Sequence, residues 1–452
     1  MSDTNLARAT TLPGREAIDP LAPYDAIMLV SYGGPYQPAD VLPFMRNATR
    51  GRGVPDERLV EVSGHYQQFG GASPINERNE ELRVAIEERL RKRGSQIPVS
   101  IGNRNWKPFI KDTLGELLAA GSRRIMVVLT SAYASYSGCR QYREDLGEAL
   151  RELRSEDARA GELQLDKVRP YFTTPGFIAA ATDAAIDAII DLAALGATTS
   201  LRHIAGMGKT TNASEPGIRI AAYHTPGKDE PAAIEPIGLD ARLVFVTHSI
   251  PTAMDEASGP VGGEVSSPVT HTTYQGQHLA VAREISRRLD DHFGTHIPWD
   301  LVYCSRSGPP FQPWLEPDIN DHLKALAAAG IRGVVAAPIG FVSDHMEVVF
   351  DLDTEAAETA TEVELDYVRA RTVGIDERFI DSLEQVIYER AEIARSGQAI
   401  AETDDLGPWP ATCRAGCCRQ RPAHSVPARD GNPARRHTQR NVPPRQTVCG
   451  ED

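Results

Sequence analysis

One short segment near the end of the chain gathers side chains that can bind a metal ion or move protons. His345, Glu347, Asp351, Asp353 and Glu355 fall within eleven residues, among apolar neighbours. On a helix, Glu347, Asp351 and Glu355 would form an acidic ladder along one face. Carboxylates and imidazole suit divalent iron or magnesium and can relay protons. A solvated acidic face is the plainer interpretation, but like charges at this spacing destabilise an isolated helix, and the neighbouring residues are apolar.

Two further candidate residues stand directly after predicted strands. His248 follows the apolar run at residues 243–247, and Tyr32 follows the run at residues 24–31 and precedes two glycines. Open α/β sheets bind ligands beyond the carboxyl ends of their strands, where loops and helix amino termini converge. Taken singly, His248 would more often be a satisfied structural residue and Tyr32 a packing residue. Because both lie at strand ends, as the acidic segment does, we expect them to face one cleft.

Alternating apolar runs and helical stretches predict an α/β fold with parallel sheets. Helical periodicity is clearest at residues 75–93 and 276–291. The predicted strands are residues 24–31, 97–102, 124–130, 167–171, 243–247, 300–304 and 333–338. They group as three in the first half of the chain and four in the second. This grouping predicts two similar α/β lobes.

The composition excludes several classes of protein. The 452 residues include 48 Lys and Arg against 62 Asp and Glu, a net charge of −14, which argues against a nucleic-acid scaffold or a polybasic membrane-surface protein. No apolar run approaches the ~18 residues of a membrane span, and the N-terminus lacks the apolar core of a secretory signal. Six cysteines in a chain of this length are no disulfide framework. We therefore expect a cytoplasmic protein that binds no nucleic acid.

Two segments differ from the rest of the chain. Residues 198–240 are rich in Gly, Pro, Ser and Thr and predict a polar surface insertion. The GMGKTT within them is not a phosphate-binding loop, because His203 occupies the position of the required first glycine. From Cys413 onward there are eight Arg and no Lys against three acids, and little apolar periodicity. We expect this tail to be mostly disordered apart from a local knot at CRAGCC.

Six motifs, taken together, resemble the ferrochelatase family in order and approximate spacing over residues 24 to about 395. They are SYGGP, GHYQQFGGASPIN, VTHSIP, SRSGPP, PWLEPDI and PIGFVSDHMEVVFDLDTEA. GCRQYRED and the late cysteines are most similar to the actinobacterial branch, the coproporphyrin III ferrochelatases. The resemblance implies two Rossmann-like lobes with a porphyrin cleft between them. It also implies a lyase that inserts Fe²⁺ into coproporphyrin III, giving Fe-coproporphyrin III on the route to haem b.

The resemblance assigns roles to particular residues. His248 of HSIP and Glu347 of SDHMEV match the pair that faces the metal-entry side of the porphyrin, and Tyr32 matches the tyrosine on the opposite face. Ser73 and Tyr142 match contacts with the porphyrin periphery. Asp351 and Glu355 continue the acidic ladder and join the implied metal site. One basic family position is Thr49 here, so Arg50 and Arg52 beside it become the candidate carboxylate partners.

The resemblance also gives the cysteines a use. Several ferrochelatases carry a [2Fe–2S] cluster on one internal and three C-terminal cysteines, and four thiolates are its normal ligand set. Cys139 matches the internal position, and Cys413, Cys417 and Cys418 supply the others. A tail with incidental cysteines is the alternative, because the adjacent pair is unusual. Cys304 is expected to be a buried strand thiol, and Cys449 receives no role.

These expectations leave other functions open. A close alternative is a protoporphyrin IX ferrochelatase, and a different class is a non-catalytic tetrapyrrole-binding or iron–sulfur sensor protein. The expected partners are coproporphyrin III and ferrous iron, with hand-over to the next haem-pathway enzyme and no transmembrane segment. The expected domains are a flexible lead at residues 1–23, a first lobe at 24–160, a second lobe at 161–395, and a C-terminal extension at 396–452.

Overall fold

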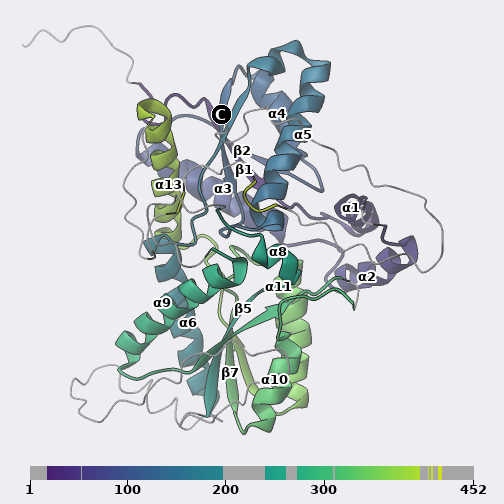
Figure 1. The fold of residues 1–452 in the computed structure, drawn as a ribbon, viewed down its shortest axis with the longest axis vertical. Coiled ribbons are helices and arrows are strands. Elements are labelled where there is room, and N and C mark those ends of the chain that lie inside the picture. Colours follow the sequence, from purple (N-terminus) through teal and green to yellow (C-terminus); the bar gives the residue numbers. More distant parts are fainter. Residues whose placement is uncertain are drawn as a thin grey trace, which may run out of the picture.

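The computed structural model shows two parallel sheets flanked by helices (Figure 1). The described residues are 18–51, 53–196, 240–260, 272–308, 311–397, 406, 409–410 and 416–419. Arg52, Cys413, Cys449 and all of the predicted insertion except Asp240 lie outside them.

Strands and helices alternate along the chain. The first sheet contains β1 (Ala26–Ser31), β2 (Val99–Asn103), β3 (Arg124–Leu129) and β4 (Gln164–Lys167), and the second contains β5 (Ala241–His248), β6 (Trp299–Cys304), β7 (Gly333–Ala337) and β8 (Asp366–Arg369). The α-helices are α1 (Val41–Ala48), α2 (Asp56–Gln68), α3 (Ile75–Lys92), α4 (Ile110–Ala119), α5 (Gln141–Glu156), α6 (Pro175–Leu195), α8 (Thr252–Glu256), α9 (Tyr274–Phe293), α10 (Ile319–Ala328), α11 (Met346–Phe350), α12 (Ala357–Glu362) and α13 (Glu377–Ser396). Two π-helical turns, Tyr136–Arg140 and Asp351–Ala356, and two 3-10 turns, Pro38–Asp40 and Ala158–Glu162, complete the described elements.

The two sheets have the same topology. Their strand orders are β2-β1-β3-β4 and β6-β5-β7-β8, and every pairing is parallel. The alternation of side chains along β1 explains how helices cover both faces of a sheet. Ile27 and Leu29 belong to the core cluster that includes α3, whereas Met28 and Val30 pack with α4 and α5 on the opposite face. The predicted α/β class with two parallel sheets is confirmed.

The predicted assignment of strands to lobes is wrong for one strand. Near the strand expected at residues 167–171, the structure has β4, which overlaps it only at Lys167; β4 pairs with β3 and so completes the first sheet. The fourth strand of the second sheet is β8, which the sequence analysis did not predict. β8 has only four residues, DYVR, and all are half-buried. A short strand at a sheet edge lacks the apolar run by which the other strands are recognised.

The two lobes share a hydrophobic core, which α13 helps to close. α13 follows the second sheet in the sequence but packs against α3 and α6 (Figure 1). Two buried ion pairs tie it to the segment around β4: Arg169 Nε lies 3.0 Å from Glu389 Oε1, and Arg390 Nη2 lies 3.2 Å from Asp166 Oδ1. One core cluster includes residues of both sheets. The helix therefore holds the two lobes together rather than belonging to one of them.

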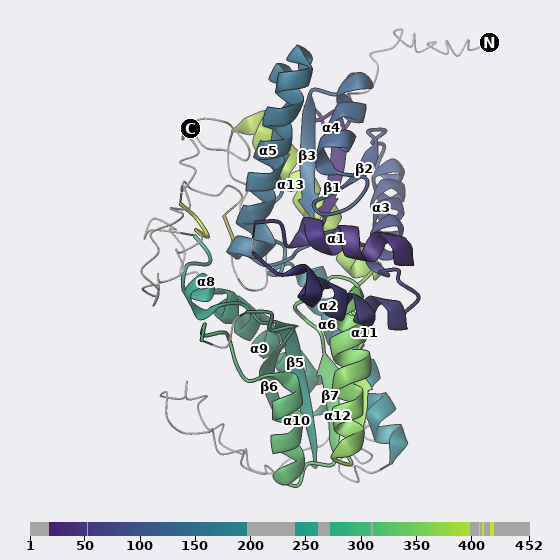
Figure 2. The same ribbon diagram turned by 90° about the vertical axis from the view of Figure 1, so that its right-hand side faces the viewer.

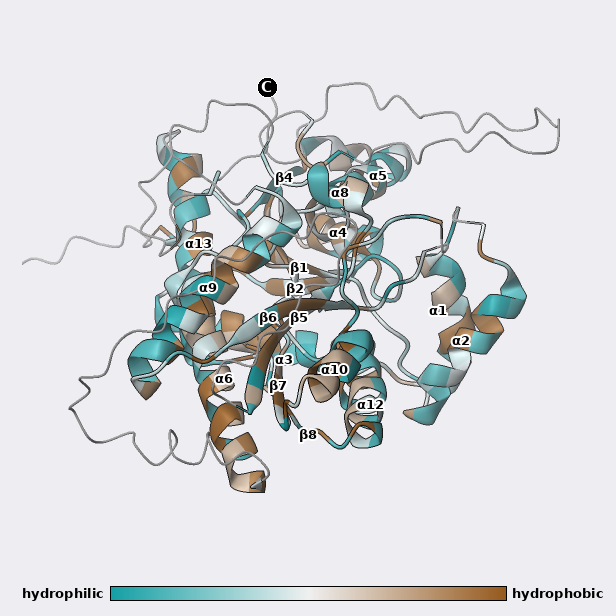
Figure 3. Cartoon of the chain, turned by 60° about the horizontal axis from the view of Figure 1, so that its bottom comes forward, coloured by the Kyte–Doolittle hydropathy of each residue, from teal (hydrophilic) through white to brown (hydrophobic). Residues whose placement is uncertain are grey.

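The outer surface is more polar than the sheets. Figure 3 shows brown strands in the middle of the molecule and many teal residues on the surrounding helices. Figure 2 shows one lobe above the other, with α1 and α2 in front, between them. Among the residues that the structure describes, no helix combines the length and apolar character needed to cross a membrane.

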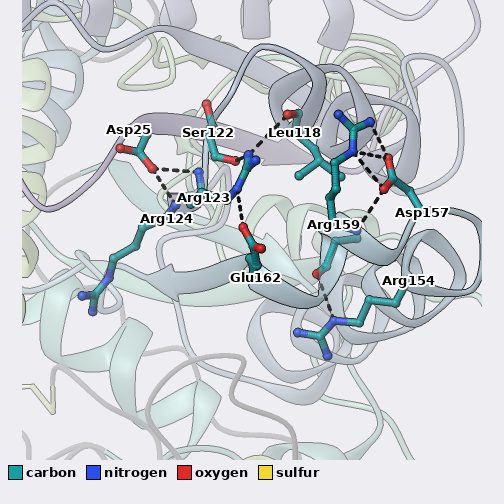
Figure 4. A network of polar contacts seen from close by, with 10 residues as sticks. Asp25, Leu118, Ser122, Arg123, Arg124, Arg154, Asp157, Arg159 and Glu162 are labelled. Carbon is teal, nitrogen blue, oxygen red and sulfur yellow. Dashed lines mark hydrogen bonds and ion pairs between the residues drawn. The ribbon is translucent and has the colours of Figure 1, made fainter.

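A polar network closes the amino-terminal edge of the first sheet, away from the candidate site (Figure 4). Asp25 Oδ2 accepts hydrogen bonds from the backbone N–H groups of Arg123 and Arg124, at 2.7 and 2.8 Å. The Arg123 side chain then pairs with Glu162 at 2.8 Å. These contacts fix the start of β3 against β1 and leave the opposite strand ends to carry the site.

Candidate active site

The first candidate side chain, Tyr32, is presented by a glycine turn at the end of β1. Gly33 has φ +77°, and a Cβ added there would lie only 2.8 Å from the Cβ of Asn103. Glycine is therefore required for the close approach of this turn to the segment after β2. Tyr32 packs edge-on against Phe44 of α1, with ring centroids 6.1 Å apart. The turn thus directs the tyrosine ring toward α1 and α2.

His248 is the last residue of β5, and its protonation state follows from a backbone contact. Its Nδ1 is hydrogen-bonded to the carbonyl of Ser249. A carbonyl only accepts, so Nδ1 carries the proton and Nε2 keeps its lone pair. Burial lowers the pKa of His248, and the nearby charge of Glu347 does not reverse this. The imidazole is therefore neutral at neutral pH, with Nε2 as its basic atom.

Glu347 lies in the first turn of α11, just beyond the loop that follows β7. Its Oε2 is 2.8 Å from Nδ1 of His345, and its side chain is 39% exposed. Burial raises the pKa of Glu347, but the charges of His345 and His248 outweigh it and lower the pKa to about 2. Burial also opposes the charged form of His345, yet the carboxylate of Glu347 raises its pKa. Glu347 therefore keeps a negatively charged carboxylate beside His248, with the imidazole of His345 as its partner.

Asp351 and Glu355 follow in the π-helical turn Asp351–Ala356, so the predicted ladder does not run along one regular helix. Burial raises the pKa of Asp351 to about 7, although Ser305 donates a hydrogen bond to it. Burial also raises the pKa of the more exposed Glu355. Asp351 interacts electrostatically with both Glu347 and Glu355, so the three acids remain consecutive neighbours.

Sequence reasoning missed the role of Ser305, although it singled out the SRSGPP motif that contains it. Ser305 follows β6 with φ +62°, a conformation that non-glycine residues rarely adopt. Such strain persists where the surrounding structure imposes it, and it clusters at functional sites. Here it accompanies the hydrogen bond from the Ser305 hydroxyl to Asp351.

The first lobe supplies a different set of side chains. Tyr142 stands at the start of α5 and is buried, and so is Ser73 before α3. The guanidinium carbon of Arg104 lies 4.4 Å from the ring centroid of Tyr142 and 5.8 Å from that of Tyr32. Tyr66 of α2 is half-buried, and Glu347, Tyr32 and Asp351 are among the groups that raise its pKa, after burial. Burial raises the pKa of Tyr142, and Glu347 is among the charges that act on it, so the two lobes meet here.

Arg104 and Tyr66 were not among the predicted site residues. Arg104 comes two residues after the predicted strand at 97–102, so the strand-end rule that found His248 would have found it too. Tyr66 lies within the GHYQQFGGASPIN motif. Only their positions in the sequence could have indicated these two residues, because neither belongs to a cluster of titratable residues.

Not every predicted residue joins this arrangement. Arg50 is exposed after the end of α1, where its Nη2 bonds to Asn47 Oδ1 at 2.7 Å. Ser73 lines a pocket of ≈ 980 Å³ together with Met346 and Val349 of α11. His248 and Glu347 do not line this pocket. The pocket therefore flanks the acidic segment instead of enclosing the His248–Glu347 pair.

Three of the predicted cluster cysteines fall within the described residues, and all three are buried. Cys417 and Cys418 have Sγ atoms 3.7 Å apart, and the backbone N–H of Gly259 donates to Cys418 Sγ at 3.2 Å. Cys139 sits in the π-helical turn Tyr136–Arg140, and Arg140 of that turn donates to the Cys417 carbonyl at 2.9 Å.

Buried thiols with an N–H donor fit the chemistry of a thiolate-bound cluster. Within the described part of the chain, however, no group of three or more His, Cys, Asp or Glu side chains has the spacing to hold a metal ion. The fourth predicted ligand, Cys413, lies outside that part. Cys304 is a buried thiol of β6, as expected, and burial raises its pKa well above the usual value.

The sequence of the chain matches a known protein family. The family model Ferrochelatase matches residues 24–199 and 220–391. The coproporphyrin III ferrochelatase of Streptomyces griseus is 44% identical over 402 residues, which cover 88% of this chain and 94% of that protein. Proteins of the same description from Leifsonia xyli and Frankia alni are 42% and 40% identical, over 88% and 90% of this chain and 92% and 91% of theirs. The residues matched by the family model include both sheets and the described site residues of the two lobes, but not Cys417 and Cys418, and on this basis the chain belongs to the ferrochelatase family.

Proposed function

We propose that this protein is a metal chelatase that inserts Fe²⁺ into coproporphyrin III and forms Fe-coproporphyrin III in haem b biosynthesis. The relatives that support this substrate are described as coproporphyrin III ferrochelatases. The observation that carries the chemistry is the pairing of a neutral His248, whose Nε2 is basic, with a permanently charged Glu347.

The reaction sets clear demands on this pair. Iron replaces two pyrrole protons, so the site must accept protons while Fe²⁺ sheds its water ligands. His248 Nε2 can take a proton or hold the iron transiently, because its imidazole is not already protonated. Glu347 offers a negative oxygen that attracts the incoming cation, and His345 keeps its carboxylate oriented. We assign His248 and Glu347 as the catalytic residues on these grounds.

Asp351 and Glu355 extend this site toward solvent. A pKa of about 7 lets Asp351 both take up and release a proton at neutral pH. Glu355 is exposed and neighbours Asp351, so it can pass protons to water or receive hydrated iron. We propose that the two acids form the route by which protons leave and iron enters.

The first lobe is proposed to hold the porphyrin. Tyr32 would contact the macrocycle face opposite His248, and Ser73 and Tyr142 would bind its peripheral carboxylates. Hydroxyl donors suit carboxylates, and each bond to a charged group contributes about 1.5–3 kcal/mol. Arg50 and Arg52 stay proposed carboxylate partners; Arg50 is exposed and pairs with Asn47, so it would have to reorient to reach a substrate.

The deciding experiment is an anaerobic metal-insertion assay on the full chain, with coproporphyrin III and protoporphyrin IX measured side by side. We expect turnover with coproporphyrin III and much weaker use of protoporphyrin IX. Equal or better use of protoporphyrin IX would overturn the substrate assignment. Porphyrin that binds without turnover under Fe²⁺ would instead favour the carrier or sensor alternative.

We also propose a [2Fe–2S] cluster held by Cys139, Cys413, Cys417 and Cys418. Its support is the burial of the three described thiols and the N–H donor at Cys418. When bound, such a cluster supplies a redox-active iron centre and a covalent link between the C-terminal segment and the turn before α5. The chain's own contribution is the Arg140 contact, which already holds Cys417 against that turn.

The visible spectrum and iron content of anaerobically purified protein test the cluster. We expect charge-transfer absorption that Cys139→Ser removes and Cys304→Ser, a matched buried cysteine of the second lobe, leaves unchanged. Absence of these bands and of iron in the unaltered protein would contradict the cluster while leaving the insertion assay unaffected.

We propose two further parts of the function. A cytoplasmic location fits coproporphyrin III, whose four carboxylates keep it in water. Hand-over of the product to the next haem-pathway enzyme fits the same setting. Fractionation of the expressing cells and product-transfer kinetics with that enzyme would test them separately.

A further inference from the structure

Arg104 is a buried cation at the strand ends of the first lobe, and its backbone is held firmly. Its N–H donates to the Ser31 carbonyl at 3.0 Å, and the next residue, Asn105, bonds to the Tyr32 carbonyl through both its backbone N–H and its side chain, at 3.1 and 3.2 Å. These bonds continue the β1–β2 pairing beyond the sheet. The base of the Arg104 side chain is therefore fixed relative to the Tyr32 turn.

The side chain is equally well defined. Only 7% of it is exposed, and its guanidinium is ion-paired with Asp145 of α5. The guanidinium also lies near two ring faces, 4.4 Å from the Tyr142 centroid and 5.8 Å from the Tyr32 centroid. A planar guanidinium stacks on aromatic rings in a way that an ammonium group does not. Arg104 thus links the two tyrosines that the proposed function places against the porphyrin.

The charge of Arg104 is only partly neutralised by its ion-pair partner, because the two side chains differ in exposure. Its partner Asp145 is 33% exposed, so water screens the acid more than it screens the buried guanidinium. Burial lowers the pKa of Arg104, but Tyr142 and Asp145 together keep it above its ordinary value, so the charge is permanent. A buried positive charge beside two phenol rings makes the surface around these rings attractive to anions.

We propose that Arg104 is a positioning residue that sets porphyrin specificity: it orients Tyr142 and Tyr32 and favours a tetracarboxylate porphyrin over a dicarboxylate one. This inference rests on the proposed function, because it concerns the substrate of that site. Arg104 acts by orienting the tyrosines and through the electrostatic field of its charge. It therefore affects substrate binding more than the insertion step at His248.

The test compares Arg104→Gln, Arg104→Lys and Asp145→Asn with the unaltered protein, using both porphyrins. Arg104→Gln should raise KM for coproporphyrin III about tenfold and change kcat less than about twofold. KM for protoporphyrin IX should rise less than about threefold, since that substrate has two carboxylates instead of four. Arg104→Lys should restore part of the preference, because it keeps the charge but loses the planar stacking.

The salt dependence of KM is a second measurement, and it would not change if the role of Arg104 were merely structural. KM for coproporphyrin III should rise with ionic strength in the unaltered protein and rise less steeply in Arg104→Gln. Asp145→Asn removes the compensating charge and should leave that KM unchanged or lower. Should Arg104→Gln fail to fold, Arg104→Lys and Asp145→Asn still decide the matter.

Equal losses with both porphyrins, or a fall in kcat with KM unchanged, would overturn the inference. So would a higher coproporphyrin KM in Asp145→Asn. Failure of the proposed function is distinguishable, because it would show as absence of insertion in the unaltered protein before any variant is compared.

Discussion

In each lobe, a π-helical turn follows the strand that is third in the order of the sheet, β3 in the first lobe and β7 in the second. Tyr136–Arg140 follows β3, and Asp351–Ala356 lies beyond β7. The first turn holds Cys139 and leads to Tyr142, whereas the second carries Asp351 and Glu355. π-helical turns break the regular spacing of a helix and are frequent at functional sites. Equivalent positions on one scaffold thus carry hydroxyl, aromatic and cationic groups in one lobe, and imidazole and carboxylates in the other.

This difference indicates a division of labour within a repeated topology. The first lobe offers neutral donors and the Arg104 charge, which suit a carboxylate-bearing porphyrin. The second offers a basic imidazole and three acids, which suit iron and protons. If the division holds, changes in the second lobe should affect the insertion rate, and changes in the first should affect substrate binding.

The largest expected effect lies in the second lobe, at Glu347. Glu347→Gln keeps the shape but removes the charge, and His248→Ala removes the proton acceptor, so each should lower kcat by about 100-fold or more. Coproporphyrin III should still bind, with Kd changed less than about threefold by fluorescence titration. Matched controls are Glu362→Gln and His296→Ala, which alter exposed residues of the same lobe. Near-normal insertion by both site variants would remove the catalytic assignment.

A second buried histidine of the same lobe shows why His248 is chemically special. His278 donates from Nδ1 to the Tyr274 carbonyl at 2.8 Å, while its Nε2 meets the Thr247 hydroxyl at 2.9 Å. Its ring stacks on Tyr133, with centroids 3.7 Å apart. Both ring nitrogens of His278 are thus used in packing the interface of the two lobes. Burial lowers its pKa to about 3, so it serves stability and not catalysis.

This contrast predicts a pH effect on stability. The folded-state pKa of His278 is below the unfolded value of about 6.5, so its neutral form contributes fully above that pH and the contribution is lost as pH falls toward about 3. By about pH 5 the loss amounts to about 2 kcal/mol. Urea unfolding of His278→Gln should therefore show a stability deficit that shrinks by this amount between pH 7 and pH 5. A deficit independent of pH would contradict the assignment.

In the first lobe, Tyr142→Phe should weaken binding without slowing insertion. The lost hydroxyl bond to a substrate carboxylate should raise KM for coproporphyrin III about tenfold, while kcat stays within about twofold. Tyr136→Phe is a matched control, because that hydroxyl bonds to Glu144 at the surface. A lower kcat with unchanged KM would erase the proposed division between the lobes.

The sequence predicted the parts of this site that are local and missed those that depend on tertiary contact. His248 and Glu347 are predicted from the sequence because strand ends and motifs mark them, and in the structure the two groups interact electrostatically. The π-helical turns were not predicted, since the acidic ladder also fits a regular helix. Arg104 became significant only when folding stacked it on Tyr142, and β8 was missed because an edge strand has no continuous apolar run.

The smallest expected effect concerns the route between site and solvent. Asp351→Asn can still accept the hydrogen bond from Ser305 but cannot take up a proton, so it should lower kcat about fivefold and leave KM for coproporphyrin III unchanged. The effect is smaller than at Glu347 because water and Glu355 offer a parallel path for protons. Glu358→Gln, an exposed change on α12, is the control. An unchanged rate in Asp351→Asn would confine the chemistry of the second lobe to His248 and Glu347.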